Sequence, residues 1–546
     1  MTIPDKPEMN TAERRRAVAQ LLVVRASGHA SDRQRRYPRW ELNNAALQEL
    51  LEAGVGGVIL LGGSATDLQQ RCRSLRHWAG HSDLLLCADV EEGVGQRFEG
   101  ASWLVPPMAL GRLQTKEPDK AVALAERYGR ITGEQAKRCG LNWVLGPVCD
   151  VNSNPANPVI NVRAWGQNAH GVADLAEAFQ RGLRSSGVLG CAKHFPGHGD
   201  TAQDSHLELP VICHSRERLK QLELIPFQRL IAAEVASVMT AHLLVPSLDD
   251  QQPATLSKPV LTDLLRQDLG FQGLVVTDAL VMEAISRHVG PGEAAVQAFE
   301  AGSDLILMPA DAHAAIDAIC AALDSGRIPE SRLHESMQRR QEALKSCSKL
   351  EPGTPGHAIE TEADHALAME LVERSLETQG PSLSPTAQQA GMNLIRVDGV
   401  LPCPVLRADS AAVTAPESLG YETRICHDKG LSPWADHGDP NEPLDLVALG
   451  DGVVFLQLFL RGNPFRGAQE RSEPWAEAIE QLLRHERLAG LIVYGCPYRW
   501  DALRSLLPAS TPAGYSPGQM PEAQECLLTK MMGTTPAQTG IRDFTD

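Results

Sequence analysis

The chain alternates short apolar runs with amphipathic stretches from about Leu21 to Leu344. The apolar runs have the length of buried strands, and most are followed by a helix-like segment such as Asp119–Lys137, Gly171–Ser185, Ser215–Ala233 or Gly292–Ala301. The expected strands are Leu21–Arg25, Val55–Leu61, Leu84–Asp89, Leu141–Pro147, Gly190–His194, Ser237–His242, Gly273–Asp278 and Ser303–Met308. Eight such units predict an α/β chain with a (β/α)8 TIM barrel, and a doubly wound open sheet is the alternative.

A chain of 546 residues is too long for one ordinary domain, so a second domain is expected. The turn-rich stretch Glu351–Gly356 ends the alternating pattern and is typical of a linker. Beyond it we expect a helix at Ala363–Ser375 and buried strands at Met392–Val397, Val453–Leu460 and Leu491–Tyr494. The predicted organisation is a barrel over residues 1–347, a linker over 348–362 and a smaller α/β sandwich over 363–546. The Pro-, Gly- and Asp-rich stretch Pro416–Pro443 has no predicted element.

Charge and composition narrow the range of partners. The net charge of −17 would repel a phosphate backbone, so no nucleic-acid partner is expected. The twelve cysteines are scattered singly, which favours reduced thiols over a disulfide framework. Residues Met1–Arg16 lack the apolar core of a signal peptide, and no run reaches the roughly 18 apolar residues of a membrane span. We therefore expect a cytoplasmic enzyme with no membrane partner.

Polar residues at the carboxyl ends of barrel strands are the first candidates for chemistry, because that rim holds the active site in known barrels. Such residues are Asp89, Lys193 with His194, His242 and Asp278. Asp278 has two interpretations. It is either the N-cap of the following helix or a carboxylate able to attack or stabilise a cationic carbon.

The segment Lys193–His206 is dense in titratable groups. Within it, Asp204 could orient His206 so that the pair donates and accepts a proton near neutral pH, unless the two belong to an ordinary surface turn. A zinc hydrolase is another hypothesis, because His194 and His198 lie four residues apart. Pro196 and Gly197 disfavour the helix that such a site would need, so we assign no metal and no cofactor. Separately, the basic residues Lys193, Arg97 and Arg163 are candidates for ligand binding or for structural ion pairs.

The segment Lys193–His206 resembles the signature of bacterial β-N-acetylglucosaminidases of glycoside hydrolase family 3. Two further stretches are similar to that family: Pro253–Ser257 with Leu269–Leu280, and Ala301–Pro309. The resemblance covers about Val18 to Leu344. It implies a TIM barrel in which Asp278 is the nucleophile, His206 the general acid/base and Asp204 its orienting partner. It also implies sugar-binding roles for Asp89, Arg97, Arg163, Lys193 and His194.

One loop departs from the family pattern. In the stretch Asp89–Arg97, Glu92 stands where the family has a glycine, and Gly95 stands where it has a valine. Since glycine permits backbone conformations that glutamate resists, we expect a different loop backbone here. The later region matches the family weakly, at Ala368–Ser375 and Ala513–Gly533.

The resemblance implies a retaining β-N-acetylhexosaminidase that acts on a carbohydrate and removes terminal N-acetylglucosamine from muropeptides or chitooligosaccharides. A cytoplasmic role in peptidoglycan recycling follows from the same resemblance. A β-glucosidase or a glycoside phosphorylase on the same scaffold is the alternative within the enzyme class. From another class, the alternative is a sugar-binding protein without activity.

Overall fold

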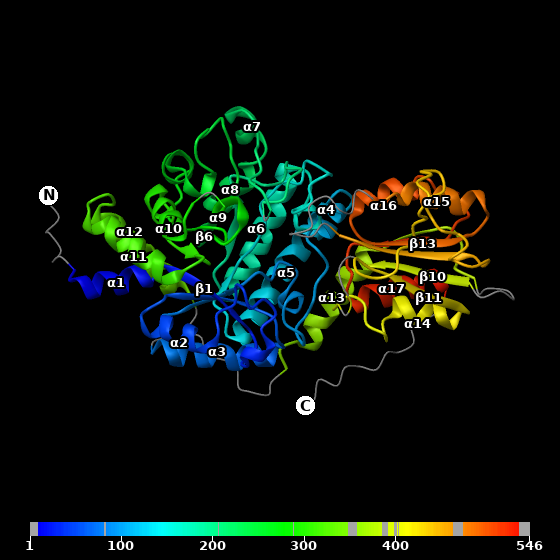
Figure 1. Ribbon diagram of the computed structural model, residues 1–546, viewed down its shortest axis with the longest axis horizontal. Coiled ribbons are helices and arrows are strands. Elements are labelled where there is room, and N and C mark those ends of the chain that lie inside the picture. The colour runs from blue at the N-terminus through cyan, green and yellow to red at the C-terminus, as the bar shows by residue number, and fades with distance from the viewer. Residues whose placement is uncertain are drawn as a thin grey trace.

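The computed structural model describes residues 9–80, 83–205, 207–287, 289–347, 358–384, 391–397, 401, 403–461 and 473–533. Figure 1 shows a strand-and-helix barrel joined to a second domain built on one sheet. The predicted linker at 348–362 lies outside the described residues over 348–357. In the described part, no helix is long and apolar enough to cross a membrane.

Eight parallel strands form a closed barrel. One sheet has the order β4-β3-β2-β1-β8 and a second has the order β5-β6-β7. Bridges between Trp143 and Leu189 and between Val276 and Leu305 join the two sheets at both edges, so the ring closes. The strands are β1 (Leu22–Ser27), β2 (Gly57–Leu61), β3 (Leu85–Ala88), β4 (Trp143–Val144), β5 (Cys191–Phe195), β6 (Ser237–Thr240), β7 (Leu274–Val276) and β8 (Ile306–Leu307). The barrel prediction is confirmed, and each strand lies at a predicted run.

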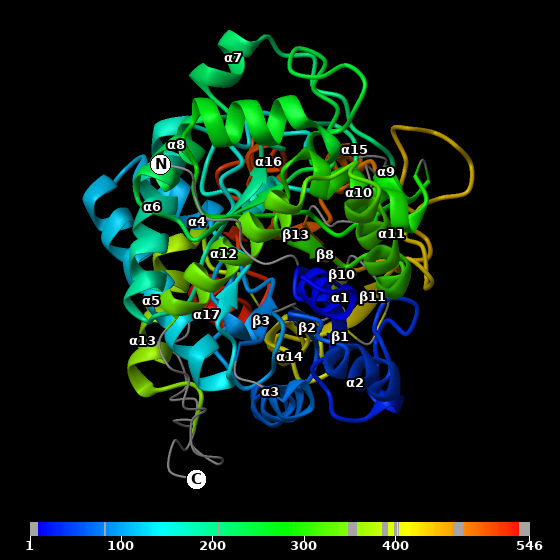
Figure 2. The same ribbon diagram turned by 90° about the vertical axis from the view of Figure 1, so that its left-hand side faces the viewer.

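Helices surround the strands, as Figure 2 shows for α2, α3, α5, α6, α10 and α11. The helices of this region are α1 (Thr11–Ala19), α2 (Asn44–Glu52), α3 (Ala65–Ala79), α4 (Met108–Gln114), α5 (Pro118–Cys139), α6 (Ala169–Ser185), α7 (Arg216–Gln221), α8 (Ile225–Ala232), α9 (Glu283–Ser286), α10 (Pro291–Ala301), α11 (Ala312–Asp324) and α12 (Glu330–Ser346). Shorter turns are η1 (Asp32–Gln34), η2 (Val94–Gln96), η3 (Asn161–Arg163) and η4 (Ala254–Leu256), and η5 (Pro259–Asp268) is a π-helix. The expected helix Ser215–Ala233 is divided into α7 and α8, with Pro226 in the first turn of α8.

Alternation along β3 separates two cores, whereas in β1 and β8 neighbouring residues belong to the same core. Leu85 and Cys87 of β3 belong to the cluster that fills the barrel, whereas Leu86 and Ala88 belong to the cluster between strands and helices. Both faces of these strands are therefore buried, which explains why the strands read as continuous apolar runs in the sequence. The same alternation determines which strand-end residues face the barrel axis.

The second domain is a six-stranded sheet with helices on both faces. Its strand order is β11-β10-β12-β13-β14-β9, and only β9 is antiparallel to its neighbour among these strands. The strands are β9 (Glu377–Gln379), β10 (Gly391–Val397), β11 (Tyr421–Cys426), β12 (Val454–Leu460), β13 (Leu488–Gly495) and β14 (Ala513–Ser516). The helices are α13 (Glu362–Ser375), α14 (Ala411–Ser418), α15 (Trp475–Arg484), α16 (Pro497–Arg504) and α17 (Pro521–Met532). In Figure 1, α15 and α16 lie on one side of the sheet, and α14 and α17 lie on the other.

The sandwich prediction for this domain is confirmed, with α13, β10, β12 and β13 at the expected positions. The sequence did not indicate β9, β11 or β14. β11 lies within the Pro-, Gly- and Asp-rich stretch that had no predicted element, and most of its residues are partly exposed. Helix α13 packs against α4 and α5 of the barrel and against α17 of the second domain, so it links the two parts.

Candidate active site

Three side chains of the core that includes the barrel interior precede a polar residue by two positions: Cys87 near the end of β3, Cys191 at the start of β5 and Val276 at the end of β7. Because side chains alternate along a strand, the residue two positions later continues the same inward-facing row. Those residues are Asp89, Lys193 and Asp278. Burial, together with the carboxylates of Asp89 and Asp278, raises the pKa of the Cys191 thiol to about 12, against the opposing effect of Lys193. Asp89, Lys193 and Asp278 therefore all lie close enough to Cys191 to influence its charge.

Lys193 is the centre of a buried polar network at this rim. Its Nζ lies 2.8 Å from Oδ1 of Asp89 and 2.6 Å from Oε1 of Glu91, and its side chain is 1% exposed. Arg163 of η3 donates to both carboxylate oxygens of Glu91, at 2.8 and 2.9 Å. Three of the predicted sugar-binding residues are therefore brought together, with Glu91 as the link between them.

The network keeps Glu91 and Lys193 charged. Burial alone would raise the pKa of Glu91, but Arg163 and Lys193 hold it well below the ordinary value. Burial alone would lower the pKa of Lys193, but Asp89 and Glu91 raise it. A charged, preorganised cluster of this kind presents fixed donors and acceptors to a polar ligand.

His194 points to a second buried carboxylate. Its Nδ1 lies 2.7 Å from Oδ2 of Asp150, and its backbone amide also contacts Asp150. The amide of His198 donates to the same carboxylate at 2.6 Å. Asp150 therefore holds both ends of the turn that begins the candidate acid/base loop. Burial would raise the pKa of Asp150, but His194 and His198 lower it.

Asp204 lies in a buried part of that loop and is 2% exposed. Its carbonyl oxygen accepts hydrogen bonds from the amides of Leu207 and Glu208, at 2.9 and 3.0 Å. The neighbouring Ser205 contacts Nε2 of His198 through its hydroxyl at 3.0 Å. The predicted acid/base His206 lies outside the described residues.

Asp278 follows β7, and its backbone is tied to β6. Its amide donates to Oγ1 of Thr240 at 3.4 Å, and Thr240 contacts the hydroxyl of Thr255 at 2.8 Å. The buried His242 bridges Thr255 and the carbonyl oxygen of Ala279, at 2.8 and 3.1 Å. The side chain of Asp278 accepts from the amide of Ala279 at 2.7 Å. The following helix α9 begins after Met282, so Asp278 is not its N-cap.

Arg97 lies at the outer rim. It is exposed, and its Nε donates to the carbonyl oxygen of Asp89 at 3.0 Å. The loop before it is tightly packed, because a Cβ on Gly95 would lie 2.3 Å from the carbonyl oxygen of Ala101. A valine at position 95 would not fit this backbone. Gly93 has φ +77°, a conformation that favours glycine.

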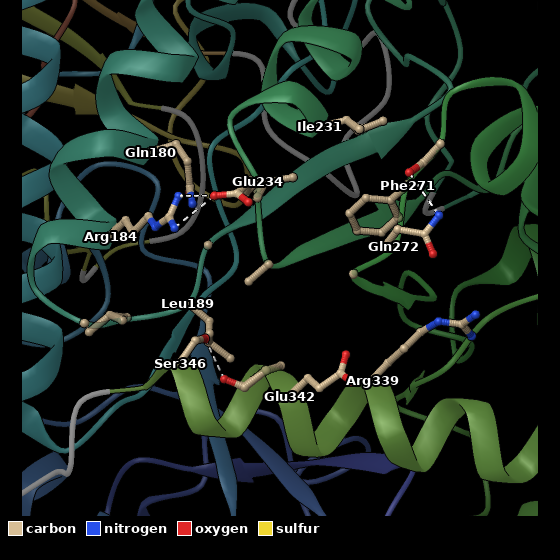
Figure 3. Close-up of a pocket in the computed structure, with 18 residues that line it drawn as sticks. Gln180, Arg184, Leu189, Ile231, Glu234, Phe271, Gln272, Arg339, Glu342 and Ser346 are labelled. Atoms are coloured by element: carbon tan, nitrogen blue, oxygen red, sulfur yellow. Dashed lines mark hydrogen bonds and ion pairs between the residues drawn. The ribbon is translucent and has the colours of Figure 1, made fainter.

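A separate cavity of about 510 Å³ lies at the opposite end of the barrel. Figure 3 shows it between α12 and the residues that precede β5, β6 and β7, with Arg184 paired to Glu234 at its edge. Since the polar network is at the carboxyl end of the strands, this cavity is distinct from the candidate site. Over the residues that the structure describes, no three His, Cys, Asp or Glu side chains form a group that could hold a metal ion.

Three residues of this site had no role predicted from the sequence: Glu91, Asp150 and Thr255. His198 had been considered only as a zinc ligand, and in the structure its amide donates to Asp150. Asp150 follows the predicted strand Leu141–Pro147, so the strand-end rule that selected Asp89 and Asp278 had a signal for it. For Glu91, the sequence offered one indication of a role in the site: Glu91 matches the family pattern. The assembled site offers an inward carboxylate, a charged polar network and a loop of histidines, a set that suits nucleophilic and acid/base chemistry on a polar ligand.

Known proteins share both parts of this architecture. Residues 14–343 match the glycosyl hydrolase family 3 N-terminal domain, and residues 384–533 match the bacterial glycosyl hydrolase family 3 C-terminal domain. Beta-hexosaminidase A of Pseudoalteromonas piscicida is 35% identical over 317 residues, which cover 52% of this chain and 52% of that protein. The chain thus matches about half the length of that relative.

Two solved structures extend the similarity. A family 3 beta-N-acetylglucosaminidase from Paenibacillus sp. FPU-7 superposes with a TM-score of 0.74 at 30% identity, over 96% of this chain and 97% of that one. NagZ from Neisseria gonorrhoeae, solved with N-trifluoroacetyl-D-glucosamine, gives a TM-score of 0.53 at 28% identity, over 65% of this chain and 98% of that one. The likeness to the first structure includes both domains.

Proposed function

The chain belongs to glycosyl hydrolase family 3, and from this premise we propose that it is a retaining exo-β-N-acetylglucosaminidase. Its substrates would be muropeptides or chitooligosaccharides that end in N-acetylglucosamine, with a role in peptidoglycan recycling in the cytoplasm. The network of the buried Lys193, Glu91 and Arg163 with the partly exposed Asp89, near Asp278, supports this function most strongly. The names of the similar proteins support the choice of sugar.

In the proposed reaction, the carboxylate of Asp278 attacks the anomeric carbon while the bond to the leaving oxygen breaks. His206 gives its proton to that oxygen, so the leaving group departs as an alcohol. His206 then takes a proton from water as the water attacks the same carbon and releases Asp278. Two inversions give a product with the original β configuration.

The other residues of the site would bind the sugar and orient His206. Asp89, Lys193 and Arg163 offer charged donors and acceptors to sugar hydroxyls, and Arg97 would add a contact from the rim. His194, whose Nδ1 faces Asp150, is left with Nε2 to meet the sugar. Asp204 would hold His206 in one orientation, as a carboxylate does for a catalytic imidazole.

Hydrolysis of nitrophenyl N-acetyl-β-glucosaminide, with and without phosphate, tests the proposal, and the plain nitrophenyl β-glucoside is the matched substrate. We expect the N-acetyl substrate to be preferred and phosphate to have no effect on rate. Faster turnover of the plain glucoside would contradict the choice of sugar, and phosphate-dependent release of a sugar phosphate would indicate a phosphorylase. Saturable sugar binding without turnover would indicate a binding protein.

Product analysis on natural substrates tests the rest of the proposal. Purified muropeptides and chitooligosaccharides should each lose one terminal N-acetylglucosamine at a time, detected by mass spectrometry. Release of internal fragments would contradict the exo action.

A further inference from the structure

Arg461 of the second domain contacts the loop that carries Asp89 and Glu91 of the sugar-binding network. Arg461 directly follows β12, and its side chain is 13% exposed. Its Nη1 donates to Oε2 of Glu92 at 3.0 Å, and Nη2 makes a second contact with Oε1 of the same carboxylate. This bidentate pair joins residues 369 positions apart in the sequence.

Glu92 is buried, with its side chain 1% exposed. Besides Arg461, it accepts a hydrogen bond from Nε1 of Trp103 at 3.0 Å. Glu92 occupies the position where the family pattern has a glycine, so the pattern itself includes no carboxylate there. A buried carboxylate that loses its cation is strongly destabilised, and the surrounding loop then moves to bring it to water.

Glu92 and Glu91 are adjacent and serve different partners. Glu91 holds Lys193 and Arg163 of the barrel, whereas Glu92 holds Arg461 of the second domain. Arg461 is attracted by the carboxylates of Glu92 and Glu91 and is repelled by the guanidinium of Arg163. Burial would lower the pKa of Arg461, but the two glutamates raise it. A shift of the Glu92 backbone would displace Glu91 directly.

We propose that Arg461 is a positioning residue for sugar binding: it fixes the loop after β3 so that Asp89 and Glu91 face Lys193 and Arg163. This inference rests on the proposed function and adds to it a role for the second domain. The arginine acts through Glu92 and does not take part in bond cleavage. Its loss should weaken binding of the sugar in the ground state and the transition state alike, which raises KM and leaves kcat nearly unchanged.

The experiment compares R461M, E92Q and the double variant E92Q/R461M with the wild type in the nitrophenyl N-acetyl-β-glucosaminide assay. R461M should raise KM about 10-fold or more while kcat stays within about 3-fold. The double variant should recover most of that loss, because it removes the unpaired buried charge along with its partner. A double variant no better than R461M would overturn the proposal, as would an unchanged KM in R461M.

Arg112 provides the matched control. It lies at the same domain boundary and pairs with Glu377 and Asp501, at 2.7 and 2.8 Å, without touching the network. R112M should lower the unfolding temperature and leave KM unchanged. An equal rise of KM in R112M would overturn the proposal, because it would assign the effect to general loosening of the domains.

The KM of E92Q and calorimetric binding of N-acetylglucosamine are the two further measurements. If R461M does not fold, E92Q alone decides: a KM at the wild-type value would overturn the proposal, and a rise of several-fold would support it. If the wild type does not turn over the substrate, the proposed function fails on its own. Calorimetric binding of N-acetylglucosamine then makes the same comparison, with a 10-fold weaker Kd expected for R461M.

Discussion

Side chains alternate along a strand, and this geometry sets the direction of Asp89, Lys193 and Asp278. Each lies two residues beyond a side chain of the core that includes the barrel interior. Asp89 and Asp278 follow β3 and β7, whereas Lys193 lies within β5. The sequence was sufficient to select them, because buried parallel strands read as apolar runs whose ends are plain. It was not sufficient to select Glu91, whose role depends on Lys193 and Arg163, both distant along the chain.

Replacement of Glu91 by glutamine should disable the network. The amide keeps the shape but removes the charge that holds Lys193 and Arg163, and the loss of one partner of a buried ion pair costs about 3 kcal/mol. We expect kcat/KM on the nitrophenyl substrate to fall by about 100-fold, measured by initial rates. Glu99→Gln is the control, since that side chain is 85% exposed. Wild-type kcat/KM in Glu91→Gln would contradict a role for the network in binding.

At the scale of elements, the loop after β5 is fixed by contacts that local sequence patterns do not show. The carboxylate of Asp150, in the segment after β4, contacts Nδ1 of His194 and accepts a hydrogen bond from the amide of His198. Gly199 lies against the backbone of Val151 so closely that a Cβ would lie 1.8 Å from its carbonyl oxygen. The strands could be predicted from hydrophobic pattern alone, whereas this packing requires the closed barrel. In the second domain, β14 has only four residues and β11 is partly exposed, so neither shows the long apolar run that marks a buried strand.

Gly199→Ala should displace the base of the loop. We expect a loss of about 1–3 kcal/mol in the free energy of unfolding, as for other overpacked sites, measured by urea denaturation. The control is Gly290→Ala, where a Cβ meets nothing within 4 Å, and which should cost at most about 1 kcal/mol as a poorer helix N-cap. Equal stability of the two variants would contradict the close packing at Gly199.

His198 should make the loop sensitive to acid. Burial is the main cause that lowers its pKa to about 4, although the charge of Asp150 opposes it. Below about pH 6.5 the unfolded chain binds a proton at this histidine, while the folded loop excludes it until about pH 4. Stability should therefore fall as pH decreases through this window, by up to about 3 kcal/mol.

Unfolding by urea at intervals from pH 7 to pH 4.5 measures this effect in the wild type and in His198→Gln. The glutamine variant should be less stable at pH 7, because it fits less well between Ser205 and Thr201, but its stability should decline less steeply. Parallel pH profiles of the two proteins would contradict a neutral, buried His198.

At the scale of the whole molecule, the two domains share a boundary rich in ion pairs. Arg112 joins Glu377 and Asp501, and Arg138 of α5 contacts Asp364 of α13 at 2.9 Å. The domain pattern could be read from the sequence, because the alternating units stop and a turn-rich stretch follows. The contacts at the boundary could not be predicted, because its ion pairs join residues more than 200 positions apart.

These pairs should make the protein unfold as one unit. We expect a single calorimetric transition for the wild type, and two resolved transitions for the double variant Arg112→Met/Arg138→Met, because the coupling between domains is then weakened. A double variant whose transition matches that of the wild type in temperature and shape would show that these pairs do not couple the domains.

Asp278 should attack the sugar in a retaining reaction, and covalent trapping of the glycosyl-enzyme can show this attack. A fluorinated N-acetylglucosaminyl donor with a good leaving group slows hydrolysis of the glycosyl-enzyme, because fluorine destabilises the oxocarbenium-like transition state. The trapped protein is digested with protease, and the modified peptide is sequenced by mass spectrometry. We expect one sugar per chain, attached to Asp278. A sugar attached to any other residue would contradict this expectation, as would an unmodified protein whose first product has the inverted anomeric configuration.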